Sequence, residues 1–378
     1  MIDYETLRCL AWVIVGLLLI GFAVTDGFDM GVSILLPVLG RNETDRRIMI
    51  NSVGPHWDGN QVWLVTAGGA IFAVWPLVYA VSFSGFYFAM LLALASLWLR
   101  PLGFDYRSKI DSPVWREVCD KALVVGGLIP TIIFGVAFGN LMQGVPFVLN
   151  DLLMTSYKGS FWGLLNPFAL LCGLLSLSMI LTQGTTWLQM KTTGSLHTRA
   201  CALSELSAIV TAALYVIAGI WAYNLDGYQI TSAIATDAAA NPLNKEVITV
   251  AHGLFQNFNH YPVLWIIPAL AVIAPIFTAL SAKKQKDGTA FALSSITVTS
   301  IILTAGIALF PFIIPSSINP SHSLTIWDAT SSEKTLGIVA LISVIMVPVI
   351  LGYTLWCYRK MFGRIDKNYI EENKTTLY

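Results

Sequence analysis

Nine long runs of apolar residues alternate with short polar stretches along the chain. They cover residues 9–39, 54–75, 77–99, 122–144, 162–188, 201–223, 262–281, 289–314 and 335–358. About 20 apolar residues in a helix span the hydrocarbon core of a bilayer, so each run predicts one crossing. The pattern therefore predicts an all-α, polytopic integral membrane protein with nine transmembrane helices.

Two of these segments need a separate argument. The chain is almost continuously apolar over residues 61–99, which as one helix would be about 58 Å long. That length exceeds one crossing, and Trp75-Pro76 is a natural turn between two. The first run is too short for two crossings. We expect it to form one helix that is either tilted or broken at Gly27 and Gly31.

The basic residues are divided unequally between the two sides of the predicted bundle. Of the 22 Lys and Arg, only Arg8, Lys158, Lys245 and Lys334 fall on one side, and the other 18 fall on the opposite side. Cytoplasmic loops of membrane proteins carry the excess of positive residues. This rule predicts a periplasmic N-terminus and a cytoplasmic C-terminus.

The composition supports this class of protein. Hydrophobic residues make up 56% of the chain and charged residues only 12%, whereas soluble domains average roughly 25% charged residues. The formal net charge is zero, which argues against a nucleic-acid partner. No linker or low-complexity tract divides the chain, so residues 1–378 are predicted to form a single membrane domain without a soluble domain.

Two carboxylates interrupt the first apolar run. Asp26 and Asp29 are three residues apart and therefore share one face of a helix. An ionised carboxylate in hydrocarbon is unfavourable by several kcal/mol unless it is paired, hydrated or protonated. The pair predicts that the protein handles protons or cations inside the bilayer. The alternative is a structural role, in which both carboxylates bond to a neighbouring helix.

The second predicted helix begins with a polar cluster near the cytoplasmic side, which includes His56, Asp58, Asn60 and Gln61. These groups could pass protons from the cytoplasm toward the middle of the membrane. For His56, helix capping within an interfacial Trp belt is an equally good interpretation. Arg100, at the end of the third predicted helix, could neutralise one carboxylate or extend to the interface.

The other histidines do not suggest a haem or metal site. His197 falls in a predicted cytoplasmic connection, and His252, His260 and His322 fall in predicted outer loops. A site built from them would need contacts between loops that the sequence does not support. We therefore expect no metal ligand and no haem ligand in this chain.

Several longer motifs carry a resemblance to a known family. They are Gly21–Gly31, Arg46-Arg47 with Asn51-Ser52, His56–Trp63, Arg100-Pro101 with Phe104–Arg107, Gly135–Asn140, Pro311–Ser317 and Trp327–Ser332. Through them the chain resembles subunit 2 of the cytochrome bd quinol oxidases over essentially its whole length. The resemblance implies a multi-pass protein of the bacterial inner membrane.

The resemblance also implies partners and cofactors. Subunit 2 forms a heterodimer with subunit 1, often with a very small, single-helix third subunit. Subunit 1 ligates two b-type haems and haem d. The complex oxidises ubiquinol or menaquinol near the outer surface and reduces oxygen to water. Protons for water come from the cytoplasm, so charge is separated across the bilayer without pumping.

At the level of residues, the resemblance implies a proton path that includes Asp58. Asp26, Asp29 and His56 are the other candidates for this path. Trp63 corresponds to a lateral oxygen entrance in the family. The candidate charge partners are Arg100 and Asp105. Some family members hold a structural ubiquinone in subunit 2, for which Trp57 and Gln61 are the candidate contacts.

Two other functions compete with this interpretation. Intramembrane carboxylates and a broken first helix are also typical of secondary transporters that couple to protons or cations. The chain could instead be a purely structural scaffold for the haem subunit.

Overall fold

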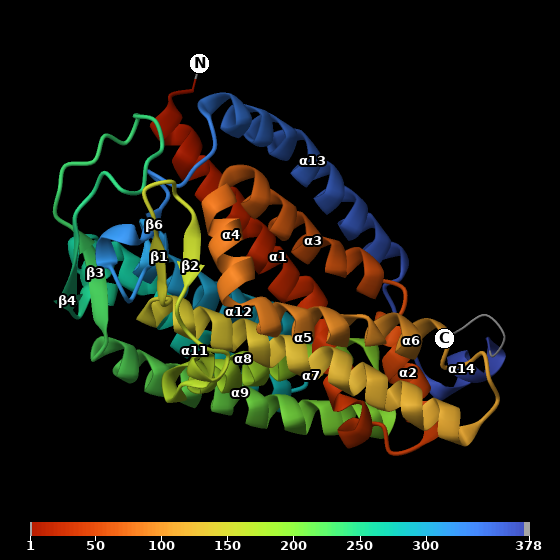
Figure 1. Ribbon diagram of the computed structural model, residues 1–378. Coiled ribbons are helices and arrows are strands. Elements are labelled where there is room, and N and C mark those ends of the chain that lie inside the picture. The colour runs from red at the N-terminus through yellow and green to blue at the C-terminus, as the bar shows by residue number, and fades with distance from the viewer. Residues whose placement is uncertain (1, 374–378) are drawn as a thin grey trace.

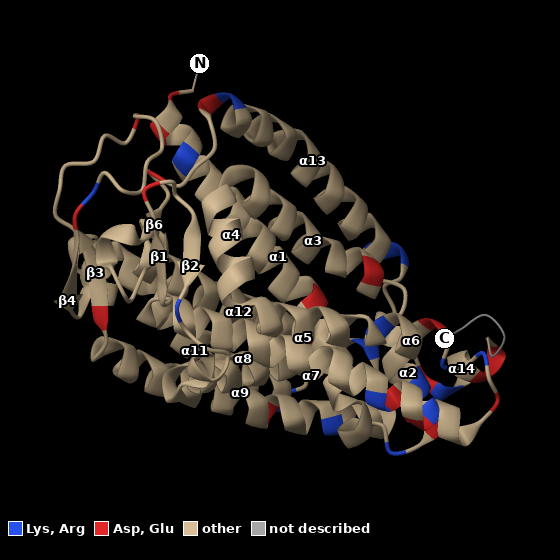
Figure 2. Ribbon diagram, in the orientation of Figure 1, with Lys and Arg blue, Asp and Glu red and all other residues tan. Residues whose placement is uncertain are grey.

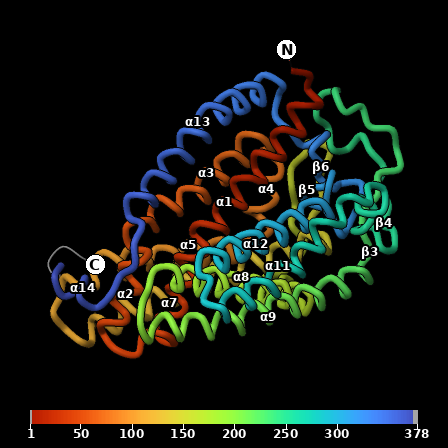
Figure 3. Tube along the Cα trace, turned by 180° about the vertical axis from the view of Figure 1, so that it is seen from behind, coloured from red at the N-terminus to blue at the C-terminus, as the bar shows by residue number. Residues whose placement is uncertain are grey.

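Helix α1 (Tyr4–Leu39) runs through the middle of a bundle of long helices in the computed structural model, which describes residues 2–373 (Figure 1). The helices that pack against α1 are α2 (Glu43–Val53), α3 (Trp57–Val74), α7 (Pro113–Gln143), α8 (Pro167–Lys191), α12 (Asp287–Leu309) and α13 (Glu333–Lys360). Seen from behind, α11 (Ile266–Lys283) lies between α12 and α9 (Gly194–Tyr223) and packs against both (Figure 3).

The remaining helices are shorter. They are α4 (Pro76–Gly85), α5 (Tyr87–Leu97), α6 (Leu99–Asp105), α10 (Gln256–His260) and α14 (Lys367–Glu372). Short 3-10 turns cover Trp162–Leu165, Gly253–Phe255, Pro262–Trp265 and Pro320–His322.

Eight helical segments within residues 2–373 are long and apolar enough to cross a membrane. They are Tyr4–Leu39, Tyr87–Asp105, Pro113–Gln143, Pro167–Lys191, Gly194–Tyr223, Pro262–Lys283, Asp287–Leu309 and Glu333–Lys360. The polytopic, mainly helical architecture is therefore confirmed. Helix α3 is not among the eight, because its first turns carry Asp58, Asn60 and Gln61. The count of nine crossings and the orientation of the termini stay predictions.

The turn predicted between the second and third segments is confirmed. Helix α3 ends at Val74, and α4 begins at Pro76. Proline has no backbone N–H to continue the hydrogen-bond ladder of α3. The free carbonyl of Val74 instead accepts a hydrogen bond from the backbone N–H of Ser331, at 2.7 Å.

The first apolar run forms one helix, as predicted. Of the two forms that we allowed for it, the break at Gly27 and Gly31 does not occur, because α1 is continuous from Tyr4 to Leu39. The glycines serve close packing instead. A Cβ atom on Gly31 would lie 2.4 Å from the carbonyl oxygen of Ile180 and 2.9 Å from the Cα atom of Gly184 on α8. Glycine is therefore required because two helix backbones meet at this point.

The prediction of an all-α protein also needs a correction, because the loops near the N-terminal end of α1 contain short strands (Figure 1). Three antiparallel pairs form: β1 (Phe147–Leu149) with β2 (Thr155–Tyr157), β3 (Asp226–Ile230) with β4 (Val247–Ala251), and β5 (Phe312–Ile314) with β6 (Leu324–Thr325). Outside the apolar segments, backbone polar groups can pair between loop segments. Hydropathy alone does not reveal such pairing.

A buried arginine ties these loops to α1. The guanidinium of Arg8 donates to the hydroxyl of Thr330 at 3.0 Å, to the carbonyl of Ala238 at 2.8 Å and to the carbonyl of Thr236. Its carbon Cζ also lies 3.7 Å from the ring centroid of Tyr4. Loops that are far apart in the sequence therefore share one anchor at this end of the bundle.

Most Lys and Arg gather at the opposite end, around α2, α6 and α14 (Figure 2). We call it the basic end. Arg107 is buried there between Glu43 and Asp120, with N–O distances of 2.8 and 2.6 Å. Burial by itself would lower the pKa of Arg107, but hydrogen bonds to both carboxylates raise the pKa above its usual value. In the same way, Arg107 lowers the pKa of Glu43 despite its partial burial. This network holds α2, α6 and α7 together.

Candidate functional site

A buried ion pair joins α1 to α6. The guanidinium of Arg100 donates two hydrogen bonds to the carboxylate of Asp26, at 2.8 and 2.6 Å, and both side chains are 0% exposed. Helix α7 leaves room for the arginine, since a Cβ atom on Gly126 would lie 2.8 Å from Cγ of Arg100. Because the contact is bidentate and charge-assisted, it belongs to the strong class of hydrogen bonds. It joins two helices through residues that are 74 positions apart in the sequence.

The second carboxylate has a different environment. Asp29 is also 0% exposed, and its Oδ2 atom accepts a hydrogen bond from the amide of Asn60 at 2.7 Å. The hydroxyl of Tyr358 on α13 donates to the amide oxygen of Asn60 at 2.6 Å. Oδ1 of Asp29 has no hydrogen-bond partner among residues 2–373. Tyr358, Asn60 and Asp29 thus form one connected chain across three helices.

The site contains two carboxylates but only one guanidinium that reaches them. Arg100 neutralises Asp26, which leaves Asp29 without a cationic hydrogen-bond partner in the described chain. An uncompensated buried charge is unfavourable by several kcal/mol. A proton or a cation at Asp29 removes this penalty. The arrangement is therefore suited to binding one positive charge beside a fixed ion pair.

Aromatic rings close the site on two sides. The ring of Trp57 stacks on Phe104 with centroids 5.1 Å apart, and Arg100 lies over Trp57 at 5.6 Å. On the α13 side, the His56 ring lies edge-on to Tyr358 with centroids 4.6 Å apart. These rings exclude bulk water and keep the local dielectric low, so the charges interact strongly.

The structure brings together only part of the residues proposed from the sequence. Asp26, Asp29 and Arg100 are in one cluster, with Trp57 and His56 at its edges. Asp58 lies on the exposed side of the first turn of α3, and Asp105 is exposed at the end of α6. Trp63 is buried against α1, because a Cβ atom on Gly21 would lie 2.8 Å from its ring. Gln61 is half-buried.

Sequence reasoning missed Tyr358. It lies near the end of the last apolar segment, among other aromatic residues, and there it is indistinguishable from an interfacial anchor. Only the packing of α13 against α3 brings its hydroxyl to Asn60. No local pattern could have identified it.

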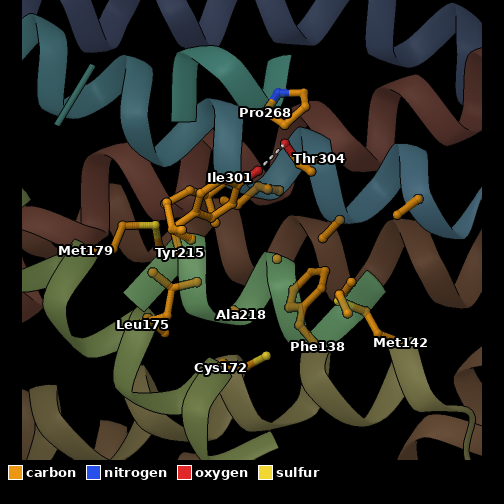
Figure 4. A pocket seen from close by; sticks show the side chains of 18 of the residues that line it. Phe138, Met142, Cys172, Leu175, Met179, Tyr215, Ala218, Pro268, Ile301 and Thr304 are labelled. Carbon is orange, nitrogen blue, oxygen red and sulfur yellow. Dashed lines mark hydrogen bonds between the residues drawn. The ribbon is translucent and has the colours of Figure 1, made fainter. Parts of the chain in front are cut away.

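A second cavity, of about 700 Å³, lies among α1, α7, α8, α9, α11 and α12. Its wall is almost entirely apolar (Figure 4). Two polar pairs border it: the Tyr215 hydroxyl donates to the Thr304 hydroxyl at 3.1 Å, and the Ser176 hydroxyl donates to the carbonyl of Thr131 at 2.8 Å. Val216 and Ile220 line the cavity and are exposed, so it opens to the outside of the bundle. Trp57 and Gln61, our candidates for quinone contact, do not line it.

The histidines do not provide a haem site in this cavity. Within residues 2–373, no histidine lines it. The prediction that His197 lies in a connecting loop is wrong, because α9 already begins at Gly194. His197 is buried and contacts Asp287 at 3.1 Å. The argument that a metal site would need contacts between loops therefore fails at this position.

The arrangement described so far defines a class: a polytopic membrane protein whose helices enclose a fixed ion pair, an additional carboxylate and an apolar cavity. Comparison with known proteins identifies the family. The family described as cytochrome bd terminal oxidase subunit II matches residues 7–361. The chain belongs to this family and is thus a subunit of a terminal oxidase, a multi-pass protein of the bacterial inner membrane.

Individual relatives agree with this assignment. The chain is 57% identical over 378 residues to the probable cytochrome oxidase subunit 2 of Haemophilus influenzae, covering 100% of both chains. It is 57% identical over 379 residues to cytochrome bd-I ubiquinol oxidase subunit 2 of Escherichia coli K12, again covering 100% of both. A solved bd oxidase structure from Geobacillus thermodenitrificans matches with a TM-score of 0.60 at 11% identity, covering 95% of this chain and 100% of that one. This last likeness concerns the fold alone.

The ion pair makes a testable prediction. Arg100→Gln is expected to destabilise the assembled protein by about 3–5 kcal/mol, because Asp26 is left buried without its counter-charge. The double variant Asp26→Asn with Arg100→Gln should recover most of this loss. Thermal unfolding of the purified complex measures both effects. Lys121→Gln is the control, since the pair of Lys121 with Glu117 is exposed and should contribute less than about 1 kcal/mol. Equal losses in the single and double variants would contradict the prediction.

Proposed function

We propose that this chain pairs with a subunit 1 to form a quinol oxidase that reduces oxygen to water. The observation that carries the proposal is the full-length similarity to ubiquinol oxidase subunits, together with the buried carboxylates Asp26 and Asp29. The two b-type haems and haem d belong to subunit 1, and a single-helix third subunit completes the complex. The chain crosses the membrane nine times when α3 is counted with the eight apolar segments. The basic end then faces the cytoplasm.

In this proposal the chain supplies part of the proton path from the cytoplasm. Asp58 is exposed at the start of α3, at the basic end, and receives protons there. Its position in the first turn of a helix stabilises its negative charge. Asp29 holds the next proton, on Oδ1, which has no partner in the described part of the chain. His56 and Tyr358 lie between solvent and Asn60 and complete the polar surroundings.

The ion pair between Asp26 and Arg100 influences proton binding at Asp29. Asp26 is bound by two hydrogen bonds from the guanidinium of Arg100. A negative Asp29 one helical turn away would repel it, so a proton on Asp29 removes the repulsion. Asn60 orients Asp29 by donating to Oδ2, which leaves Oδ1 for the proton. Asp29 can therefore take up and release a proton while its neighbours stay in place.

Trp63 is proposed to border a lateral oxygen entrance. A run of small residues, Ala67 to Ala70, follows Trp63 along α3. A Cβ atom on Gly68 or on Gly69 would have no atom within 4 Å. The outer face of α3 is therefore thinly covered, which suits the passage of a small apolar gas toward a partner subunit.

The apolar cavity is proposed to hold the isoprenoid chain of a ubiquinone in a structural role. The cavity is large enough for a chain of this kind, and its wall is apolar. The Thr304 hydroxyl already donates to the carbonyl of Ser300 at 2.7 Å, and Tyr215 donates to Thr304. Both hydroxyl protons are thus in use, so the site favours burial of a tail over recognition of a head group.

Two other functions are not favoured. A proton-coupled transporter has no support from the family, all of whose relatives cited above are oxidase subunits. A pure scaffold for the haem subunit would not need a buried carboxylate beyond the ion pair. The Asp58 variant separates this scaffold from a proton-conducting subunit.

Asp58→Asn is expected to slow turnover more than it weakens quinol binding. Asn keeps the size and the hydrogen bonds of Asp but does not titrate. Oxygen consumption and haem content of the purified complex are measured across pH. Asp111→Asn, an exposed carboxylate at the same end, is the control. Wild-type turnover with full haem would mean that Asp58 is structural. Haem content that falls in step with activity would mean that Asp58 belongs to subunit docking.

Trp63→Ala is expected to change the oxygen association rate while assembly stays intact, because a large ring is removed from the proposed entrance. Flow-flash or stopped-flow kinetics with the reduced complex measures this rate. Trp98→Ala is the control, since Trp98 is an exposed tryptophan at the end of α5. An unchanged rate in an assembled Trp63 variant would leave Trp63 with a packing role only.

Ala218→Phe is expected to lower the amount of quinone that copurifies with the complex. Ala218 is buried and lines the cavity, so a phenyl ring there occupies the space of the isoprenoid chain. Lipid extraction followed by mass spectrometry measures the quinone. Ala213→Phe lies on the exposed side of the same helix and should change nothing. Equal quinone content in both variants and the wild type would refute the proposal that the cavity holds a quinone.

A further inference from the structure

Three potential metal ligands meet at the basic end, away from the site described above. His197 and Cys201 lie on the first turns of α9, and Asp287 is the first residue of α12. All three side chains are buried, and one ligand atom from each lies within 4.8 Å of the others. The His197 Nε2 atom is 3.1 Å from both carboxylate oxygens of Asp287 and 3.7 Å from the Cys201 sulfur.

The spacing of these residues suits a metal ion. His197 and Cys201 are four residues apart, so they lie on one face of α9. Zinc binds nitrogen and oxygen at about 2.0–2.2 Å and sulfur at about 2.3 Å in a tetrahedron. From these lengths, the edges of the tetrahedron are about 3.3 Å for N–O and 3.5 Å for S–N. The observed 3.1 and 3.7 Å are close to these edges. The sulfur and the carboxylate oxygen lie within 4.8 Å of each other, and they would have to approach each other for all three to bind one ion.

A cation already contacts this cluster. The guanidinium of Arg364 lies 2.5 Å from Oδ2 of Asp287, and its side chain is 49% exposed. Arg364 lies in the segment that follows α13. The backbone N–H of Ile365 donates a hydrogen bond to the carbonyl of Lys191, and the ammonium group of Lys191 donates one to the carbonyl of Met361, so the backbone of this segment is held in place. Because Arg364 reaches the carboxylate from the solvent side, it can withdraw without disturbing the helices. A metal ion and Arg364 would thus compete for Asp287.

Other charges near the cluster are already paired. Glu205, one turn beyond Cys201 on α9, lies 3.8 Å from Lys283. The cluster itself is neutral when the thiol is protonated, since Arg364 balances Asp287. On binding Zn²⁺, Cys201 loses its proton to solvent, and the thiolate and Asp287 together balance the two charges of the ion. Arg364 is then released.

We propose that His197, Cys201 and Asp287 form a binding site for Zn²⁺ or a similar transition metal, with water as the fourth ligand and Arg364 as the built-in competitor. Such a site clamps α9 to α12 and is independent of the proton path. A purely structural role, in which the three residues only join the helices, is the alternative that the test must exclude.

The test uses the purified oxidase complex, treated with a chelator and then desalted. Zn²⁺ is added in competition with a chromogenic chelator, and bound zinc is counted. We expect the wild-type complex to bind one zinc ion more than the Cys201→Ser complex does. Cys201→Ser and His197→Asn should each weaken binding at least about tenfold. Cys357→Ser, which changes a half-buried thiol on α13, is the matched control.

Substitution of Arg364 is expected to change the zinc affinity in the opposite direction. Arg364→Ala should tighten zinc binding by up to about fivefold, the change that corresponds to losing an ion pair in which the arginine is screened by solvent. Arg364→Lys keeps the charge and should bind zinc like the wild type. Haem spectra confirm that each variant is assembled, and the mild Cys201→Ser change keeps the test valid if His197→Asn fails to assemble. Zinc binding that is the same in Cys201→Ser and wild type, or no tightening in Arg364→Ala, would overturn the proposal.

Discussion

The bidentate contact between Arg100 and Asp26 is the interaction on which the rest of the structure depends. Two charges in an apolar interior are tolerated only when they meet at hydrogen-bonding distance. This requirement holds α6 against α1 and demands a glycine at position 126 of α7 to accommodate the arginine. It also determines the character of Asp29. With the guanidinium already bound to Asp26, Asp29 has no cationic hydrogen-bond partner among residues 2–373.

Close approach of helix backbones is the second constraint. At Gly31 and Gly184 the backbones of α1 and α8 meet so closely that neither residue could carry a Cβ atom without displacement. In a membrane the apolar effect does not drive helices together, and packing of small residues takes its place. Helix α1 is therefore held on one side by a backbone contact with α8 and on the other by hydrogen bonds through Asp29, Asn60 and Tyr358.

The two ends of the bundle use charge in different ways. At the basic end, Arg107 joins Glu43 and Asp120 across three helices, and Arg199 pairs with Asp45 at 2.6 Å. At the other end two of the basic residues, Arg8 and Lys245, are buried anchors. Arg8 donates to loop carbonyls, and Lys245 pairs with Asp328 at 2.8 Å. The unequal distribution of charge between the two ends thus also supplies contacts that organise the loops.

The sequence by itself determined the apolar segments, the turn at Trp75-Pro76, the charge asymmetry and the intramembrane position of Asp26 and Asp29. These properties depend on residues that are adjacent along the chain, where hydropathy and the absence of a proline N–H act locally. Only the tertiary structure decided that Arg100 pairs with Asp26 and that Tyr358 reaches Asn60. It also decided that α1 stays unbroken and that His197 meets Asp287. Each of these outcomes depends on contacts between helices that are distant in sequence, for which no local pattern exists.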